Sequence, residues 1–279
     1  MAVTEEQVRT LKEKARRMRI DILKMLHGSG SGHTGGSLSA ADIMTALYFY
    51  KMKYDPKNPD WKERDYFILS KGHAAPVLYT TLAQAGFLET AELCTLRKLG
   101  SRLQGHPDSK YLPGVEISTG SLGQGLSVAC GIAIAQKLDK KPNRVYALLG
   151  DGELQEGQIW EAAMTAAHYK LDNLCVLVDN NGLQIDGPVA KVMGVEPITD
   201  KWRAFGWDVQ DIDGHDMAQL TTALDKAETV KGRPTAIVCR TVKGKGSKCF
   251  EGKVEFHGTT PSKEELETAL KELDEAVCK

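Results

Sequence analysis

The sequence predicts an α/β protein with a doubly wound, mainly parallel sheet that carries helices on both faces. Residues 144–149 and 174–179 form two short apolar runs, each followed or ended by an acidic residue, as is typical of buried parallel strands. Residues 156–168, between them, are rich in helix formers. A strand, a helix and a strand in this order form one unit of a parallel sheet, so both strands end at the same edge.

The other elements follow from periodicity and from residues that end helices or loops. Apolar residues at three- and four-residue spacing predict a helix over residues 4–27, which Thr4 and Gln7 can cap. We expect further helices over residues 40–50, 74–85, 123–138 and 217–231, and strands over 66–69, 207–212 and 235–239. In the helix over 123–138, residues such as Gly125 and Gly131 leave little side-chain bulk on any face, so we expect another backbone to come close.

Polar residues follow the first two strands at the edge where ligands of doubly wound sheets bind. The first strand leads into Gly150-Asp151-Gly152-Glu153, and the second into Asn180-Asn181-Gly182. A hard divalent cation needs oxygen ligands, which the Asp151 carboxylate, the Asn181 amide and the backbone carbonyl of Leu183 can supply. Either loop alone fits solvent-exposed residues equally well, but the pair predicts a site for a metal-bound diphosphate.

This pair of motifs resembles the signature of thiamine diphosphate enzymes, and the chain from about Gly32 to Gly258 is similar to transketolase. The resemblance rests on several motifs that stand in the family's order. They are Ser31-Gly-His33, Leu69-Ser-Lys-Gly-His73-Ala-Ala-Pro, Gly105-His106-Pro107, Gly120-Ser-Leu-Gly-Gln-Gly125, Gly150-Asp-Gly152 and Lys243-Gly-Lys-Gly246 with Phe256-His257-Gly258.

The resemblance implies a transketolase subunit that transfers a two-carbon ketol unit from a ketose phosphate to an aldose phosphate. It implies thiamine diphosphate and Mg²⁺ or Ca²⁺ as cofactors. Residues 1–279 resemble the family's diphosphate-binding domain alone. The pyrimidine-binding domain, with the carboxylate that activates the cofactor, is therefore expected on a carboxy-terminal partner subunit in an α2β2 assembly. The residues that hold a sugar phosphate lie mainly in that domain, so the chain does not specify the sugar.

Histidines beside glycine in loops are the candidate catalytic residues. By resemblance, His33 and His257 would flank the acceptor and the scissile hydroxyl, and His73 and His106 would lie nearer the cofactor. Groups that titrate near neutrality could serve proton transfer in both directions. The remaining histidines, His27, His168 and His215, match no family position and are interpreted as structural.

Further residues are expected to bind the cofactor by resemblance. These are Gly120, Ser121, Leu122, Asp151, Gly152, Glu153, Asn181 and Lys243, together with His73 and His257. The lysines of residues 243–248 lack interleaved aromatic residues, which disfavours a nucleic-acid patch. The chain departs from many transketolases at Gly36, where they have serine, so substrate preference could differ there.

Two other functions remain open at the sequence level. One is a subunit of a thiamine enzyme that oxidatively decarboxylates 2-oxo acids, which the set of histidines and the segment from Lys243 to His257 disfavour. The other is a non-catalytic thiamine diphosphate-binding or regulatory protein. A neighbouring reading frame that encodes a pyrimidine-type domain would favour an enzyme over the non-catalytic alternative.

Composition indicates which partners and which cellular compartment to expect. With 36 Lys and Arg against 37 Asp and Glu, the net charge of −1 gives no reason to expect nucleic acid or a membrane surface as a partner. The 6 cysteines form no Cys-x-x-Cys pair and mostly lie in apolar runs, which favours a reducing cytoplasm. Acidic residues near the amino terminus argue against a transit peptide, and no apolar run is long enough to span a bilayer.

Overall fold

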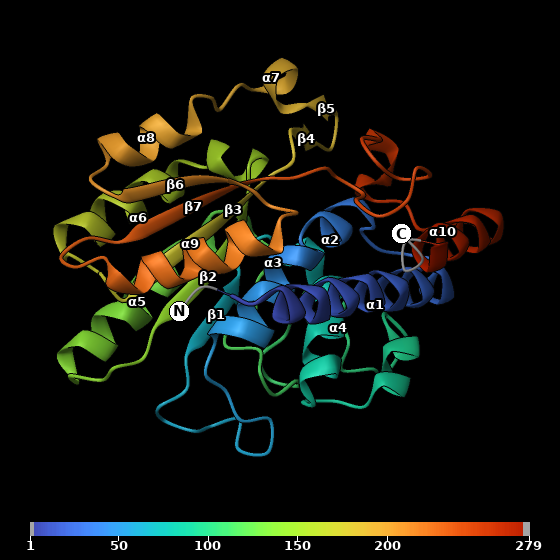
Figure 1. The fold of residues 1–279 in the computed structure, drawn as a ribbon, viewed down its shortest axis with the longest axis horizontal. Helices are drawn as coiled ribbons and strands as arrows, with labels where there is room; N and C mark the ends of the chain where they lie inside the picture. Colours follow the sequence, from blue (N-terminus) through green and yellow to red (C-terminus); the bar gives the residue numbers. More distant parts are fainter. Residues whose placement is uncertain (1–2, 276–279) are drawn as a thin grey trace.

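The computed structural model describes residues 3–275 and is built around a sheet of five parallel strands (Figure 1). The strand order is β1-β2-β3-β7-β6. The strands are β1 (Tyr66–Leu69), β2 (Val145–Gly150), β3 (Leu174–Asn180), β6 (Asp208–Asp213) and β7 (Thr235–Arg240). Each predicted strand is present within one or two residues of its expected bounds. Continuous apolar runs mark buried strands such as β2 and β3 clearly, whereas the edge strand β6 alternates apolar and polar residues.

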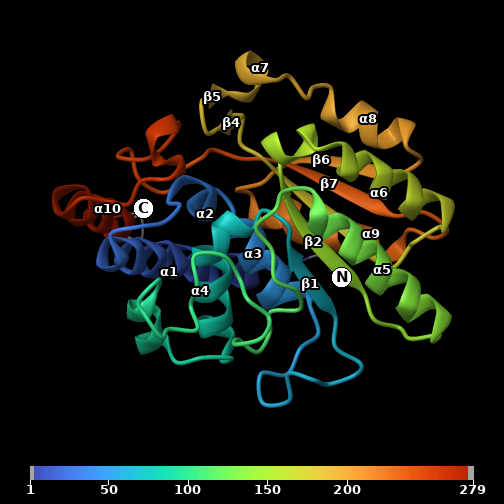
Figure 2. The same ribbon diagram turned by 180° about the vertical axis from the view of Figure 1, so that it is seen from behind.

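Helices cover both faces of the sheet, so the predicted doubly wound fold is confirmed (Figures 1 and 2). One face packs against α1 (Glu5–Ser29), α3 (Ala41–Ala46), α4 (Ala75–Ala85) and α9 (Met217–Thr229). The other packs against α5 (Gln124–Leu138), α6 (Gly157–His168) and α8 (Ile198–Ala204). Alternate strand residues feed the two cores, as Leu177 does on one face and Val178 on the other.

Local signals set several of the helix ends. Thr4 and Gln7 form the predicted capping box, with the Gln7 N–H donating to Thr4 Oγ1 at 3.2 Å. The helix α1 runs beyond residue 27 and ends at Gly30, whose φ of 63° is left-handed. In α5, a Cβ at Gly125 would lie 2.6 Å from Ser70, which confirms the expected close approach at that position. Gly131, however, faces open space, so the close approach does not extend along the helix.

The helix predicted over residues 40–50 is present, since α3 runs directly into a π-helical turn over Leu47–Lys51. The change to π-helical geometry was not predicted, nor was the short helix α2 (Gly35–Ser39) before it. Further elements were not predicted either: the antiparallel pair β4 (Leu183–Gln184) and β5 (Gly187–Pro188), then α7 (Val189–Val192), α8 and α10 (Lys263–Glu275). The last of these packs beside α1.

The path of the chain places a binding edge at the ends of β2, β3 and β7. After β3 the chain crosses to β6 at the far edge and returns through α9 to β7, which lies next to β3. The path along the sheet therefore reverses between β6 and β7, and the loops after β2, β3 and β7 leave the sheet at the same edge, where ligands of doubly wound sheets bind. The edge strands differ in kind: β1 is short, and β6 carries Asp208, Asp211 and Asp213.

Most cysteines are packed as small apolar residues. Cys130, Cys175 and Cys239 are buried, Cys249 is half-buried and Cys94 is exposed, while Cys278 lies outside the described residues. Over residues 3–275, no helix combines the length and apolar character that crossing a membrane requires.

Candidate active site

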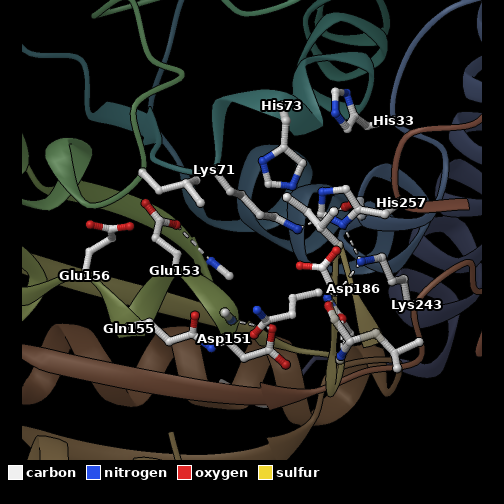
Figure 3. A pocket seen from close by; sticks show the side chains of 18 of the residues that line it. His33, Lys71, His73, Asp151, Glu153, Gln155, Glu156, Asp186, Lys243 and His257 are labelled. Carbon is white, nitrogen blue, oxygen red and sulfur yellow. Dashed lines mark hydrogen bonds between the residues drawn. The ribbon is translucent and has the colours of Figure 1, made fainter. Parts of the chain in front are cut away.

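A cavity of about 340 Å³ opens at the carboxyl edge of the sheet (Figure 3). Its walls come from the loops that follow β1, β2, β3 and β7, together with α2 and the turn around Gly120. Among the residues predicted for the site, those that line the cavity are His33, His73, Gly120, Leu122, Asp151, Gly152, Glu153, Asn181, Leu183, Lys243 and His257. The structure thus brings residues from distant parts of the sequence to one place.

The three predicted metal ligands lie together in this cavity. Asp151 is 3% exposed, and its carboxylate accepts hydrogen bonds from the N–H groups of Gly152 at 2.7 Å and Gly182 at 2.5 Å. Asn181 Oδ1 accepts a bond from the Leu183 N–H at 3.1 Å, which fixes the turn between these two residues. All three residues therefore line one cavity and carry oxygen atoms, the ligands that a hard cation prefers.

Burial, and then the neighbouring Asp179, raise the pKa of Asp151 to about 6. A bound cation would offset both effects by stabilising the charged carboxylate, so the donor set fits a divalent metal. Among the described residues, no group of three or more His, Cys, Asp or Glu side chains is placed to hold a metal. Any metal here would therefore need Asn181, a backbone carbonyl and the ligand's own oxygens.

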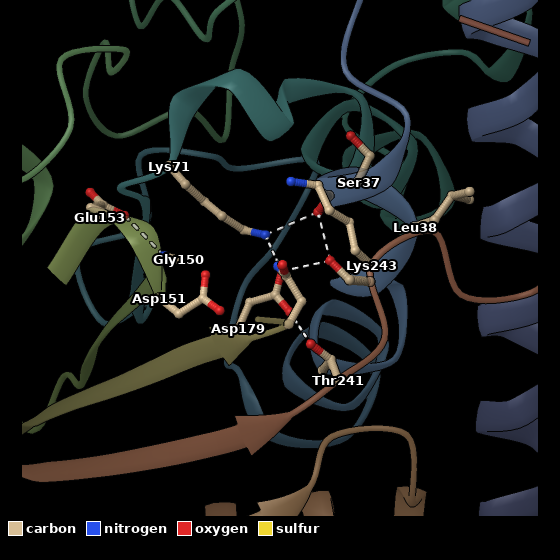
Figure 4. Close-up of polar contacts among 12 residues, drawn as sticks. Ser37, Leu38, Lys71, Gly150, Asp151, Glu153, Asp179, Thr241 and Lys243 are labelled. Atoms are coloured by element: carbon tan, nitrogen blue, oxygen red, sulfur yellow. Dashed lines mark hydrogen bonds and ion pairs between the residues drawn. The ribbon is translucent and has the colours of Figure 1, made fainter. Parts of the chain in front are cut away.

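A buried ion pair between Lys71 and Asp179 forms the floor of the site (Figure 4). Their side chains are 2% and 0% exposed, and Lys71 Nζ lies 2.5 Å from Asp179 Oδ2. The carboxylate also accepts bonds from Ser39 Oγ at 2.6 Å, Asn181 Nδ2 at 3.1 Å and Thr241 Oγ1. Although burial acts to raise it, the pKa of Asp179 is lowered by the charge of Lys71 and by the hydrogen bonds from Lys71, Ser39 and Thr241. The pair therefore orients Asn181, a predicted metal ligand, from behind.

Lys71 and Asp179 have no role among the sequence-based predictions, although both stand in the motifs. Each is a charged residue at the end of an apolar strand, at positions 71 and 179. Charged residues in such places are rarely buried unless they are paired, and this is the signal that could have found them.

Lys243 reaches the cavity from the loop after β7. It is 2% exposed, and its Nζ donates to the Leu183 carbonyl at 3.1 Å and to His257 Nδ1 at 2.8 Å. Burial, and then the charge of Lys71, lower the pKa of Lys243 to about 8. The side chain passes Gly35 so closely that a Cβ there would lie 2.8 Å from Lys243 Cγ. Lys243 is thus packed into place beside the predicted metal ligands.

The four predicted histidines form one cluster. The centroid of the His33 ring lies 5.2 Å from that of His73, 5.6 Å from that of His257 and 6.2 Å from that of His106. The rings of His73 and His257 stack with their centroids 5.1 Å apart. His33 Nδ1 is buried without a hydrogen-bond partner in the structure. Buried polar atoms are usually paired, so this unpaired nitrogen of a residue that lines the cavity is a candidate partner for a ligand.

The expectation that these histidines titrate near neutrality is not met in the isolated chain. Burial, with the nearby cations Arg97, Lys71 and Lys243, lowers the pKa of His33 to about 4, His257 to about 3 and His73 to about 2. The pKa of His106 is lowered too, by burial and then by Arg97. All four imidazoles are therefore neutral at pH 7, and each offers one donor and one acceptor.

Two of the predicted site residues, His106 and Ser121, do not line the cavity, and a third, Glu153, lines it but has its carboxylate bonded to the protein. His106 is exposed at the rim, where it packs on Gly120. Ser121 is exposed and does not line the cavity. Glu153 lines it, but its carboxylate accepts bonds from Ser70 Oγ at 2.5 Å and the N–H groups of Gly123 at 2.9 Å and Gly150 at 3.0 Å. Glu153 therefore holds two loops together at the site.

The lowered pKa of His73 predicts a stability that depends on pH. Its folded pKa is about 2, against an ordinary value of 6.5, so the unfolded chain takes up the proton first as the pH falls. The contribution of His73 is therefore present above pH 6.5 and is lost progressively below it. We expect His73→Asn to be more stable relative to wild type at pH 5 than at pH 8. Thermal unfolding of both proteins at the two pH values checks this, and an unchanged difference in Tm would contradict it.

Comparisons with known proteins agree with this geometry. The model of the family "Transketolase, thiamine diphosphate binding domain" matches residues 10–274. The chain is 44% identical to a 6-deoxy-6-sulfo-D-fructose transketolase subunit of Clostridium sp. (strain MSTE9), over 98% of both chains. It is 41% identical to an apulose-4-phosphate transketolase subunit of Phocaeicola vulgatus, over 97% of this chain and 96% of the relative.

The solved structures are longer than this chain. Transketolase from Campylobacter jejuni superposes with a TM-score of 0.90 and 35% identity, over 96% of this chain and 43% of that one. The chain thus spans less than half of that transketolase. With a matching family model, full-length relatives and a shared fold, the chain belongs to the transketolase family and carries its thiamine diphosphate-binding domain.

Proposed function

We propose that the chain works as one half of a two-subunit transketolase, with a divalent metal held by Asp151, Asn181 and the Leu183 carbonyl. Ketol transfer with thiamine diphosphate is the general reaction of the family. The observation that carries the proposal is the convergence of these oxygens, Lys243 and the histidine cluster on one cavity. Mg²⁺ is the metal we favour, with Ca²⁺ as the alternative, since both take oxygen ligands.

The residues around the cavity divide into those that would hold the cofactor and those that would face the sugar. Lys243 and the backbone around Gly120 and Gly152 lie beside the predicted metal ligands, where they can approach a diphosphate. When bound, thiamine diphosphate supplies the electron sink for the carbon–carbon bond cleavage. The neutral rings of His33 and His257 can accept or donate a proton at the sugar hydroxyl groups.

The substrates that we propose are sugars with an anionic end, sugar phosphates above all. The names of the two relatives support this, since one names a sulfosugar and the other a sugar phosphate. The charge of Arg97 acts on both His33 and His106, so a cation lies at the outer end of the histidine cluster. We further propose a cytoplasmic location, which the cysteine pattern of the sequence supports.

We expect the purified chain to be inactive by itself and to gain activity on mixing with a partner that carries a pyrimidine-binding domain. The relatives are named as subunits, which implies such a partner. The two proteins would be assayed separately and then together, with thiamine diphosphate and Mg²⁺ and a ketose and aldose phosphate pair. Ketol transfer at a normal rate by this chain alone would contradict the proposal.

We expect the histidines of the cluster to act on the sugar more than on the fold. His33→Ala, His106→Ala and His257→Ala should each slow ketol transfer by about a hundredfold to ten-thousandfold, the usual effect of losing a positioned proton-transfer group. His73→Ala should weaken both transfer and cofactor binding, because the His73 ring is buried near Lys71. His168→Ala is the control, since that ring is exposed and contacts Tyr169 instead of the cavity.

Transfer rates, cofactor affinities and melting temperatures of the five variants would be compared in the assembled enzyme. Equal loss of activity across the set, or unfolding in place of slower turnover, would show that the histidines are structural.

A further inference from the structure

A second polar cluster is buried behind the active site, outside the cavity. It joins Arg19 of α1, Asp42 of α3 and His215, which precedes α9. Arg19 and Asp42 are both 6% exposed, and two guanidinium nitrogens of Arg19 donate to the Asp42 carboxylate at 2.5 and 3.1 Å. The same carboxylate lies 2.7 Å from His215 Nδ1. None of these residues lines the cavity.

The cluster holds both ends of the short loop that carries Lys243. At the start of the loop, the Val242 N–H donates to His215 Nε2 at 2.9 Å. At its far end, Arg19 Nε donates to the Lys245 carbonyl at 2.9 Å. Lys243 lies between these two points, so the residue that enters the cavity is fixed on either side by partners outside it.

The two hydrogen bonds of His215 fix the tautomer of its ring. Arg19 and His215 hold the pKa of Asp42 at about 2 in spite of its burial, so Asp42 is an acceptor at neutral pH. Nδ1 of His215 must therefore carry the proton that it shares with Asp42, and Nε2 must accept from the Val242 N–H. A neutral ring with this tautomer satisfies both contacts, and a second proton on Nε2 would break the contact with Val242.

The loop also packs against the cluster and has little freedom to move. A Cβ at Gly246, whose φ is 117°, would lie 2.6 Å from Arg19 Cδ. The Gly244 N–H donates to the Gly35 carbonyl at 3.0 Å, and the Lys243 side chain passes the same glycine. Burial disfavours the charged form of a lysine unless its ammonium group is hydrogen-bonded. The Lys243 ammonium group reaches its two acceptors, the Leu183 carbonyl and His257, only if the backbone of the loop is held in place.

We propose that Arg19, Asp42 and His215 are positioning residues that set the loop of residues 242–245 so that Lys243 Nζ lies between the Leu183 carbonyl and His257. This inference rests on the proposed function for the role of Lys243 beside the diphosphate. It also changes the interpretation of His215, which acts through the Val242 N–H on a residue of the site. Positioning partners of this kind typically change ligand affinity by about tenfold to a hundredfold when they are removed.

Two substitutions of His215 separate its two hydrogen bonds. His215→Asn can keep a donor near Nδ1 for Asp42 but places no acceptor at the Val242 N–H, whereas His215→Gln can place its Oε1 where Nε2 lies. In the isolated chain, we expect His215→Asn to speed hydrogen exchange over residues 241–246 and His215→Gln to leave it nearly unchanged. His27→Ala is the control, because His27 contacts the Pro261 carbonyl and not the loop.

The assembled enzyme provides the second measurement. We expect His215→Asn to weaken thiamine diphosphate binding by about tenfold or more in calorimetry, while His215→Gln stays near wild type. In a Lys243→Met background, His215→Asn should cause no further loss, since it acts through Lys243. The same loss in both backgrounds, or equal effects of the Asn and Gln variants, would overturn the proposal.

The exchange experiment needs no cofactor and no partner, so it remains decisive if the proposed function fails. If the assembled enzyme binds no thiamine diphosphate but exchange over residues 241–246 follows the His215 substitutions, the function is wrong and the loop contact is right. If His215→Asn does not fold, the wild-type chain still decides, because a Val242 amide that exchanges as fast as an unprotected amide would refute the contact.

Discussion

Asp151→Ala is expected to abolish the metal-dependent binding of thiamine diphosphate by the assembled enzyme. The substitution removes the carboxylate at the centre of the proposed metal site, and breaking a buried charge interaction typically costs about 3–5 kcal/mol. An affinity loss of more than about a hundredfold should therefore appear in calorimetry with Mg²⁺ present. The fold should survive, because burial and Asp179 already disfavour the charged form of Asp151.

Asp186→Ala is the matched control for this experiment. Asp186 is an exposed carboxylate that lines the same cavity, and it is not among the proposed metal ligands. Its loss should change cofactor affinity little. Wild-type affinity in the Asp151→Ala enzyme would show that the metal lies elsewhere, and an equal loss in both variants would point to a general effect of charge.

Asp179→Ala should be the most destabilising substitution among the polar residues of the site. It leaves the Lys71 ammonium group buried with the Gly36 carbonyl at 2.9 Å as its remaining acceptor. Thr241 loses its acceptor at the same time, and Ser39 keeps only the longer contact of 3.3 Å to the Gly36 carbonyl. Removing one partner of a buried pair typically costs about 3–5 kcal/mol of unfolding free energy, which urea denaturation of the isolated chain would measure.

Two comparisons make this prediction specific. Asp200→Ala breaks the exposed ion pair with Arg203, whose side chains are 67% and 54% exposed, and should cost less than about 1 kcal/mol. Lys71→Met combined with Asp179→Leu should recover part of the stability, because neither charge is then left alone. If Asp179→Ala lowered the free energy of unfolding no more than Asp200→Ala does, the buried pair would contribute nothing to the stability of the fold.

The sequence predicted the sheet better than it predicted the helices that cross the site. Strands such as β2 and β3 are continuous apolar runs that end at polar residues, so both their type and their bounds are visible. Residues 35–51 are almost wholly buried, and a segment buried on all sides has no periodicity that could show where α2 ends and α3 begins. The β4–β5 pair was missed because two-residue strands leave no pattern.

The sequence likewise predicted some residues of the candidate site and its surroundings but not others. Asp151 and Asn181 follow strand ends, so spacing and chemistry were enough to suggest them before the fold was known. Arg19 and His215 lie about two hundred positions apart in the sequence, and only the packing of α1 against the start of α9 brings them to one carboxylate. A charged residue among apolar ones, such as Arg19 in α1, shows that a buried partner exists but not which residue it is.

The two edge strands bear on how the protein behaves before it assembles. An open sheet presents unpaired backbone groups at its edges, and another chain can add a strand there and begin aggregation. Here β1 has only 4 residues, and β6 exposes Asp211 and Asp213 along the other edge. Both features discourage strand addition. The sheet of this chain is thus protected against self-association at both of its edges, with or without a partner subunit.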